Sequence, residues 1–90
     1  MEASPPITVL FVCVHNSGRS QMAEAFFNHL AKGRYLAASA GTQPAPQINA
    51  SVARVMAEVG VDLRGHKPRL LTREMVDSAQ RVISMGCGAA

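Results

Sequence analysis

The fold is decided by a single stretch of the chain, Val9-Leu10-Phe11-Val12-Cys13-Val14-His15-Asn16-Ser17-Gly18-Arg19-Ser20. Its first half belongs to an apolar, β-branched run from Ile7 to Val12, which predicts a short strand buried on both faces at the centre of a parallel sheet. A polar loop follows the strand at once, and a helical pattern starts at its far end. The stretch therefore predicts a strand, a tight loop and a helix, with Cys13 where the strand ends.

Helical and strand patterns alternate along the rest of the chain. The first helix is expected to bury the i, i+4, i+8 stripe of Met22, Phe26 and Leu30 and to stop at Gly33. The later elements are expected in this order: a strand over 35–40, a turn over 41–46, a helix over 48–59, a basic connection over 61–71, a helix over 72–80 capped by Thr72, and a strand over 81–85. This alternation predicts an α/β fold, βαβαβ, with parallel strands and right-handed crossovers.

Composition limits the class of protein. The 90 residues allow one small domain, here 7–90 after a Pro-containing lead over 1–6 that is expected to be disordered. Basic residues gather only around 64–73, where His66 is given no role, and no aromatic stripe accompanies them, so nucleic-acid binding is not expected. The N-terminus lacks the features of a signal peptide, and no apolar run approaches the ~18 residues of a membrane span. A cytoplasmic protein without a membrane partner is therefore expected.

Two cysteines, Cys13 and Cys87, are too few for a disulfide scaffold and form no CxxC pair for zinc, so neither a metal nor a cofactor is expected. Both follow predicted strands, and the carboxyl ends of parallel strands meet at one edge of a sheet. Glycines on both sides of Cys87 leave its sulfur accessible. A second accessible thiol is needed for a redox cycle but not for hydrolysis of a phosphate ester. The plain alternative is an incidental cysteine at a strand end.

The loop after Cys13 carries the groups that bind a tetrahedral oxyanion. Five residues offer N–H groups that no proline removes, namely Val14, His15, Asn16, Ser17 and Gly18. If these groups converge, they form a nest for the anion, to which the helix N-terminus adds. Arg19 can bind two oxygens of the anion bidentately. Together with the helix N-terminus it favours the thiolate form of the cysteine. The alternatives are an inert core thiol for Cys13 and a surface charge for Arg19.

The polar residues of the loop have ordinary explanations beside the functional ones. Ser17 and Ser20 either hydrogen-bond the thiolate or cap the helix. Asn16 either holds the loop through its side chain or makes a plain turn. His15 is either a base or a residue at the rim. Gly18 allows the tight backbone turn before the helix.

From Cys13 to Phe26 the sequence resembles the active-site segment of the arsenate reductases built on the low-molecular-weight protein tyrosine phosphatase fold. The continuation Ser20-Gln21-Met22-Ala23-Glu24 is typical of the reductase branch, because the phosphatases usually place proline after that serine. The resemblance continues through 39–42, 55–63 and 82–88. It implies a three-layer α/β sandwich with a small parallel sheet.

The resemblance also implies roles for the loop. Cys13 would be the nucleophile that attacks arsenate held by residues 14–19, and Arg19 would bind the oxyanion and stabilise the transition state. The residues that would hold the loop or keep the thiol ionised are Asn16, Ser17 and Ser20. Cys87 would resolve the arsenic adduct, releasing arsenite and leaving a disulfide that thioredoxin or another thiol reductant would reduce.

The family usually has a further strand, a last helix and an Asp-Pro loop that supplies a general acid. Here Asp62 and Asp77 precede Leu and Ser, so the resemblance implies a form truncated at its C-terminus. An open sheet edge could then pair with a second copy of the chain. Two other functions stay open: a phosphomonoesterase acting on phosphotyrosine or a small aryl phosphate, and a fragment that binds an oxyanion without turnover.

Overall fold

Three parallel strands make up the sheet of the computed structural model, which describes residues 7–85. They are β1 (Val9–Cys13), β2 (Ala37–Gly41) and β3 (Arg81–Ser84), in the order β2-β1-β3. The predicted central position of the first strand is confirmed, as is its parallel pairing with both neighbours. The lead over 1–6 and the second cysteine, Cys87, lie outside the described residues.

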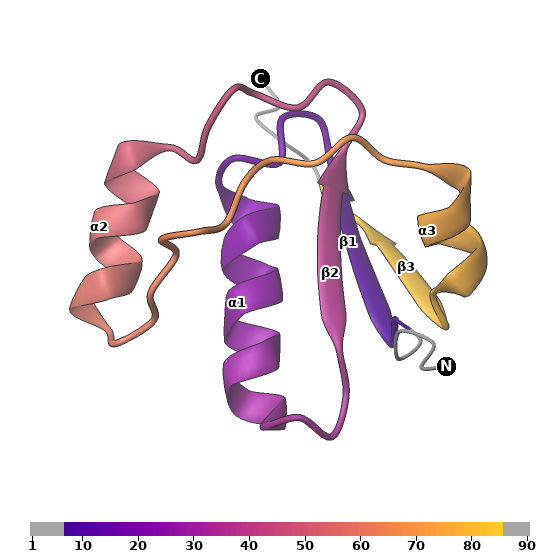
Figure 1. Ribbon diagram of the computed structural model, residues 1–90, viewed down its shortest axis with the longest axis horizontal. Helices are drawn as coiled ribbons and strands as arrows, with labels where there is room; N and C mark the ends of the chain where they lie inside the picture. Colours follow the sequence, from indigo (N-terminus) through magenta and orange to yellow (C-terminus); the bar gives the residue numbers. More distant parts are fainter. Residues whose placement is uncertain (1–6, 86–90) are drawn as a thin grey trace.

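Helices cover both faces of this sheet (Figure 1). One face carries α1 (Arg19–Ala31), the other carries α3 (Arg73–Ser78), and α2 (Ala50–Glu58) packs outside α1. An apolar cluster around Leu10, Ala38 and Ala40 joins the sheet to α3, and a second cluster around Ala25 and Met56 joins α1 to α2. The arrangement is the α/β sandwich that the sequence predicts.

The two edge strands differ in burial. All five residues of β2 are buried, because α1 and α3 lie against its two faces and its small side chains let them approach closely. All four residues of β3 are exposed. The register pairs Cys13 with Gly41, so the end of β1 lies beside the end of β2 at the carboxyl edge of the sheet.

The buried face of α1 differs from the predicted one. Met22, Phe26 and Leu30 were expected to form its core stripe, but Leu30 is 74% exposed and Phe26 is 40% exposed. The helix buries a mainly polar set instead, which consists of Ser20, Gln21, Glu24 and Ala25. Met22 packs against the core as predicted, but Phe26 and Leu30 do not belong to the buried face, because apolar spacing alone takes no account of hydrogen-bond partners: the polar side chains of α1 find theirs on Asn16, on β2 and in the connection 61–71.

The helix caps also correct the prediction in part. Gly18 is the N-cap of α1 and makes no side-chain cap, so neither Ser17 nor Ser20 serves that purpose. Thr72 caps α3 as predicted, with its hydroxyl accepting from the Met75 N–H at 3.2 Å. Asn49 caps α2, which begins at Ala50, two residues later than expected. Within residues 7–85 no helix is long and apolar enough to cross a membrane.

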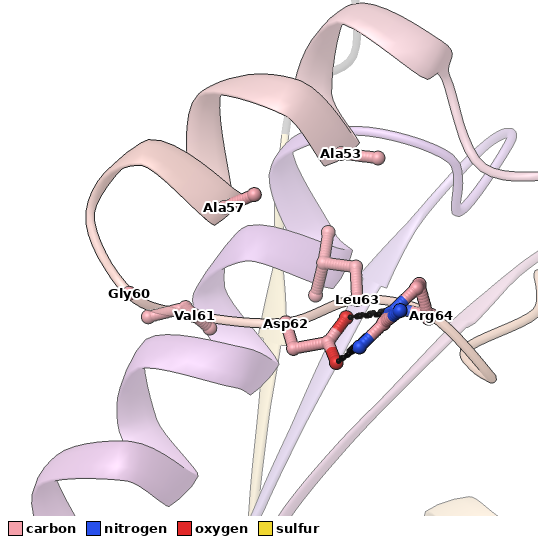
Figure 2. Close-up of a pocket in the computed structure, with 7 residues that line it drawn as sticks. All are labelled: Ala53, Ala57, Gly60, Val61, Asp62, Leu63 and Arg64. Carbon is pink, nitrogen blue, oxygen red and sulfur yellow. Dashed lines mark hydrogen bonds and ion pairs between the residues drawn. The ribbon is translucent and has the colours of Figure 1, made fainter.

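A shallow pocket of about 480 Å³ lies between α2 and the chain that follows it, lined by Ala53, Ala57 and residues 60–64 (Figure 2). On its rim the Arg64 guanidinium donates to both carboxylate oxygens of Asp62, with N–O distances of 3.0–3.1 Å. These hydrogen bonds hold the pKa of Asp62 below its ordinary value.

Removing this ion pair by Asp62→Asn is expected to leave the free energy of unfolding near neutral pH almost unchanged. Both side chains are largely exposed, so water and salt screen the pair. Because the pKa of Asp62 is lowered in the folded state, whatever the pair contributes is present above the carboxyl's unfolded pKa and disappears as the pH falls through the folded value. Urea unfolding of the two proteins at pH 7 and pH 3 measures this; a large difference at pH 7 would contradict it.

Candidate active site

Cys13 is the last residue of β1, and Arg19 is the first residue of α1. The segment 13–19 between them, called the Cys13 loop below, therefore lies at the carboxyl edge of the sheet, where ligands bind in open α/β folds. The thiol is buried, with 6% of the residue exposed. Within residues 7–85 its sulfur is contacted by the Asn16 N–H, which donates at 3.1 Å, and by the Ser20 hydroxyl, which lies at 2.9 Å.

The carbonyl groups of the Cys13 loop face away from the thiol. The segment after β2 runs alongside the loop and donates four backbone hydrogen bonds to it, which are Thr42 N to Cys13 O, Gln43 N to Val14 O, Ala45 N to His15 O and Asn49 N to Ser17 O, at 2.8–3.1 Å. The Asn16 carbonyl accepts from the Gln21 side chain at 3.2 Å, and the Gly18 carbonyl accepts from the Met22 N–H at 2.9 Å. Every carbonyl from Cys13 to Gly18 thus has a partner outside the loop's concave side.

The direction of the carbonyls determines the direction of the amides. The peptide bonds of the described chain are trans, and in a trans peptide the N–H points opposite to the preceding carbonyl. The N–H groups of residues 14–19 therefore point away from the partners of the carbonyls, and the N–H of Asn16 donates to Cys13 Sγ. A set of amides facing one point, next to a helix N-terminus, is an arrangement that binds anions.

Asn16 holds this geometry in place. Its residue is fully buried and adopts a left-handed backbone conformation with φ of 52°, which asparagine tolerates better than most residues. Its Oδ1 accepts from the Arg69 backbone N–H at 2.9 Å and from Gln21 Nε2 at 3.0 Å, while its Nδ2 donates to Ser20 Oγ at 2.7 Å. The side chain therefore ties the Cys13 loop to α1 and to the connection 61–71.

Gly41 allows the loop to lie against the end of β2. A Cβ at this position would sit 2.5 Å from the Val14 carbonyl oxygen and 3.0 Å from the Asn16 Cβ. Its backbone also pairs with the connection 61–71, through Gly41 N to Arg69 O and Leu71 N to Gly41 O, both at 2.8 Å. Sequence analysis placed only a turn here; the need for glycine comes from chain segments far apart in the sequence.

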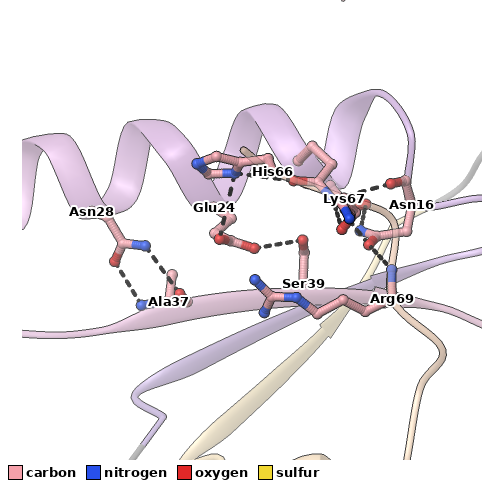
Figure 3. Close-up of polar contacts among 10 residues, drawn as sticks. Asn16, Glu24, Asn28, Ala37, Ser39, His66, Lys67 and Arg69 are labelled. Carbon is pink, nitrogen blue, oxygen red and sulfur yellow. Dashed lines mark hydrogen bonds and ion pairs between the residues drawn. The ribbon is translucent and has the colours of Figure 1, made fainter. Parts of the chain in front are cut away.

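The remaining predicted site residues differ in their exposure to solvent. Val14, His15 and Arg19 are exposed, and Ser17 and Gly18 are half-buried, so they form the rim of the site above the buried thiol. The sequence indicates no function for a polar group next to the loop, which consists of the buried Gln21, Glu24 and Ser39 and the half-buried His66; Figure 3 labels Glu24, Ser39 and His66. Their spacing in the sequence carries no recognisable signal, because three separate elements bring them together.

In this group the carboxylate of Glu24 accepts from the Ser39 hydroxyl at 2.7 Å on one oxygen and lies 3.9 Å from His66 Nδ1 on the other. The same His66 nitrogen lies 3.4 Å from Gln21 Oε1. The connection 61–71 was expected to leave His66 without a role; the structure shows it half-buried against α1. Residues 7–85 contain no cluster of histidine, cysteine and carboxylate side chains that could hold a metal ion.

One class of α/β protein is defined by three features in sequence: a cysteine that ends a central parallel strand, a tight loop, and an arginine that begins the next helix. Residues 8–90 match the family described as low molecular weight phosphotyrosine protein phosphatase, and the chain belongs to that family.

Among its relatives is a putative arsenate reductase of Halobacterium salinarum, 40% identical over 82 residues that make up 86% of this chain and 58% of the relative. Among solved structures, a thioredoxin-dependent arsenate reductase of Corynebacterium glutamicum is 42% identical with a TM-score of 0.87, covering 99% of this chain and 45% of that one. An arsenate reductase in the phosphate binding state is 34% identical with a TM-score of 0.81, covering 93% of this chain and 64% of that one. The chain thus spans about half the length of these proteins.

Proposed function

We propose that this chain carries the nucleophile and the oxyanion loop of an arsenate reductase. The observation that supports this most is that every carbonyl from Cys13 to Gly18 is hydrogen-bonded to a group beyond the loop, while the Asn16 amide donates to the buried sulfur. Relatives in sequence and in structure are arsenate reductases, and one is described in a phosphate-bound state. Phosphate and arsenate share the tetrahedral shape and charge that such a loop recognises.

In the proposed reaction the Cys13 thiolate attacks arsenic(V), and an arsenate oxygen leaves as water after protonation. Amides of residues 14–19 and the Arg19 guanidinium stabilise the charge on the remaining oxygens. The Cys87 thiolate then attacks the Cys13 sulfur, and the electron pair of the S–As bond stays on arsenic, which leaves as arsenite. The two thiols supply the two electrons and become a disulfide, which thioredoxin or another thiol reductant reduces.

The path of the chain supports this role for Cys87. The Met85 N–H donates to the Val12 carbonyl at 2.7 Å, so the chain leaves β3 at the edge of the sheet where Cys13 lies. Cys87 follows Met85 by two positions in the sequence, and two residues span at most about 7 Å. A dithiol cycle also requires a reducing compartment, so we infer a cytoplasmic location.

The activity is tested by measuring arsenite release with thioredoxin, thioredoxin reductase and NADPH. The unsubstituted chain is expected to turn over, Cys13→Ser to be inactive, and Cys87→Ser to stop turnover after the adduct forms. The phosphatase alternative rests on the family to which the chain belongs. It predicts hydrolysis of an aryl phosphate that is indifferent to Cys87→Ser. Anion binding without either product would identify a binding fragment and refute the proposal.

Cys13 is expected to alkylate faster than Cys87 near pH 6, and phosphate or arsenate should protect it. The Asn16 N–H and the Ser20 hydroxyl at the sulfur favour the thiolate, and the bound anion would cover it. Mass spectrometry of iodoacetamide-treated protein, with and without 10 mM-range phosphate, gives both rates. Equal rates for the two thiols, unaffected by anion, would contradict an activated Cys13.

The exposed edge strand β3 supports a further proposal, that two copies of the chain pair along this edge. All four residues of β3 are exposed, including Val82 and Ile83 at 47% and 44%. Exposed apolar edges are templates for strand pairing. Sedimentation velocity over a concentration series tests this, since Ile83→Lys should shift a dimer toward monomer; a monomer at all concentrations would exclude pairing.

A further inference from the structure

We propose that His66 is a positioning residue for Cys13, acting through a chain of hydrogen bonds in which every donor points toward the thiol sulfur. The inference rests on the proposed function, because it assigns control of the same nucleophile. The groups involved are buried or half-buried, and they come from the connection 61–71, from α1 and from the Cys13 loop. The directions are derived from the Arg69 backbone N–H, which can only donate, and are then extended to the Ser20–Cys13 and His66–Gln21 contacts, in which either atom could be the donor.

The orientation of the Asn16 side-chain amide is fixed first. The Arg69 backbone N–H can only donate, and it contacts Asn16 Oδ1 at 2.9 Å, so the amide nitrogen Nδ2 must be the atom that faces Ser20. Ser20 Oγ therefore accepts from Nδ2 at 2.7 Å. Its own hydrogen is then available for the Cys13 sulfur at 2.9 Å, where it favours the thiolate.

Gln21 extends the chain away from the thiol. Its Nε2 faces three acceptors, which are the carbonyl of Asn16, the Oδ1 of Asn16 and the carbonyl of Lys67, at 3.0–3.2 Å. This fixes the amide so that Oε1 points the other way, toward His66 Nδ1 at 3.4 Å. The same ring nitrogen faces a second oxygen, Glu24 Oε2, at 3.9 Å. Two acceptors in front of one nitrogen require that Nδ1 carries the hydrogen.

The carboxylate of Glu24 also favours a hydrogen on Nδ1 of His66. Glu24 has only 7% of its side chain exposed, and a buried carboxylate is costly without a cationic partner. His66 can supply that partner as an imidazolium. The other groups around the ring are the Gln21 amide on α1, the Ser39 hydroxyl on β2 across Glu24, and the basic neighbours Lys67 and Arg69 on its own connection. The Nδ1–H of His66 thus orients Gln21 and faces Glu24 at once.

The consequence is measurable at Cys13. Loss of the His66 donor frees Gln21, then Asn16, and the Ser20 hydroxyl is no longer directed at the sulfur. His66→Ala is expected to lower the rate of Cys13 alkylation at pH 6 by about 2- to 10-fold, the range that one net hydrogen bond represents. Because the contact requires a hydrogen on Nδ1 and not a charge, the difference from the unsubstituted protein should be present at pH 6 and at pH 8 alike.

The experiment measures Cys13 alkylation by iodoacetamide from pH 5.5 to 8, with and without phosphate, in four proteins of full length. His66→Asn places an amide N–H near the position of Nδ1 without a titrating charge and is expected to recover most of the rate at pH 6. His29→Ala changes an exposed histidine on α1 and should behave like the unsubstituted protein. A purely structural role for His66 would lower stability without slowing the alkylation of Cys13 in the folded protein.

The outcomes separate this inference from the proposed function. If phosphate does not protect Cys13 in the unsubstituted protein, the proposed function fails. If phosphate protects but His66→Ala matches the unsubstituted rate at every pH, the inference alone is overturned. Should His66→Ala fail to fold, the comparison is made with His66→Leu, which fills the space but offers no donor: a rate equal to that of the unsubstituted protein overturns the inference, and a slower rate supports it.

Discussion

Asn16→Ala is expected to lower the free energy of unfolding by about 3–4 kcal/mol and to slow Cys13 alkylation at pH 6 by about 10-fold. Three buried side-chain hydrogen bonds are lost, to Ser20, Gln21 and Arg69, and their partners are left without an equivalent. The backbone at this position has a φ of 52°, which alanine adopts at a further cost of about 1–2 kcal/mol. Denaturant unfolding and alkylation kinetics measure the two effects.

Two further variants separate stability from chemistry. Asn16→Asp keeps an acceptor for the Arg69 N–H but turns an oxygen toward Ser20, so the Ser20 hydroxyl should donate to the carboxylate and leave the sulfur. Its alkylation rate should therefore fall even if the fold survives. Asn28→Ala is the matched control, because Asn28 also binds backbone with its side chain, at Ala37 N and Ala37 O, but far along α1 from the thiol. If Asn28→Ala slows alkylation as much, the special role of Asn16 is disproved.

Gly41→Ala is expected to distort the Cys13 loop and abolish phosphate protection of the thiol. The added methyl group would meet the Val14 carbonyl oxygen at 2.5 Å, and backbone cannot move aside as the end of a side chain can. Overpacking of this kind costs about 1–3 kcal/mol. The displaced loop would lose the hydrogen bonds that turn its carbonyls outward, so the amides would no longer face the anion.

Gly60→Ala is the matched control for this substitution. Gly60 has a φ of 84° and nothing within 4 Å of an added methyl group, so alanine costs stability through backbone strain alone, about 1–2 kcal/mol. It lies at the end of α2, away from the Cys13 loop. Anion protection should be lost in Gly41→Ala and kept in Gly60→Ala, as measured by alkylation with increasing phosphate. Retained protection in Gly41→Ala would show that the close approach of β2 is not required.

Much of the fold follows from local patterns. The β-branched run before Cys13 predicts a buried central strand, and the structure places β1 between two parallel neighbours. The capping role of Thr72 could be predicted locally, because a threonine that precedes Glu74 and a helical pattern needs no distant contact to cap the helix. The face of α1 could not be predicted in this way. Leu30 has the right spacing for the core, yet it is exposed, while Glu24 is buried because Ser39 and His66 meet it there.

Local sequence by itself determined the order of elements and the presence of a thiol, a loop and an arginine at the end of the first strand. Hydrophobic period and residue spacing act over a few positions, and those features depend on nothing more. Only the tertiary structure decided which groups surround the thiol. Asn16 meets Arg69 from 53 positions away, and Gly41 meets Val14 across the sheet edge. Such contacts depend on how three elements pack, and no local pattern encodes that distance.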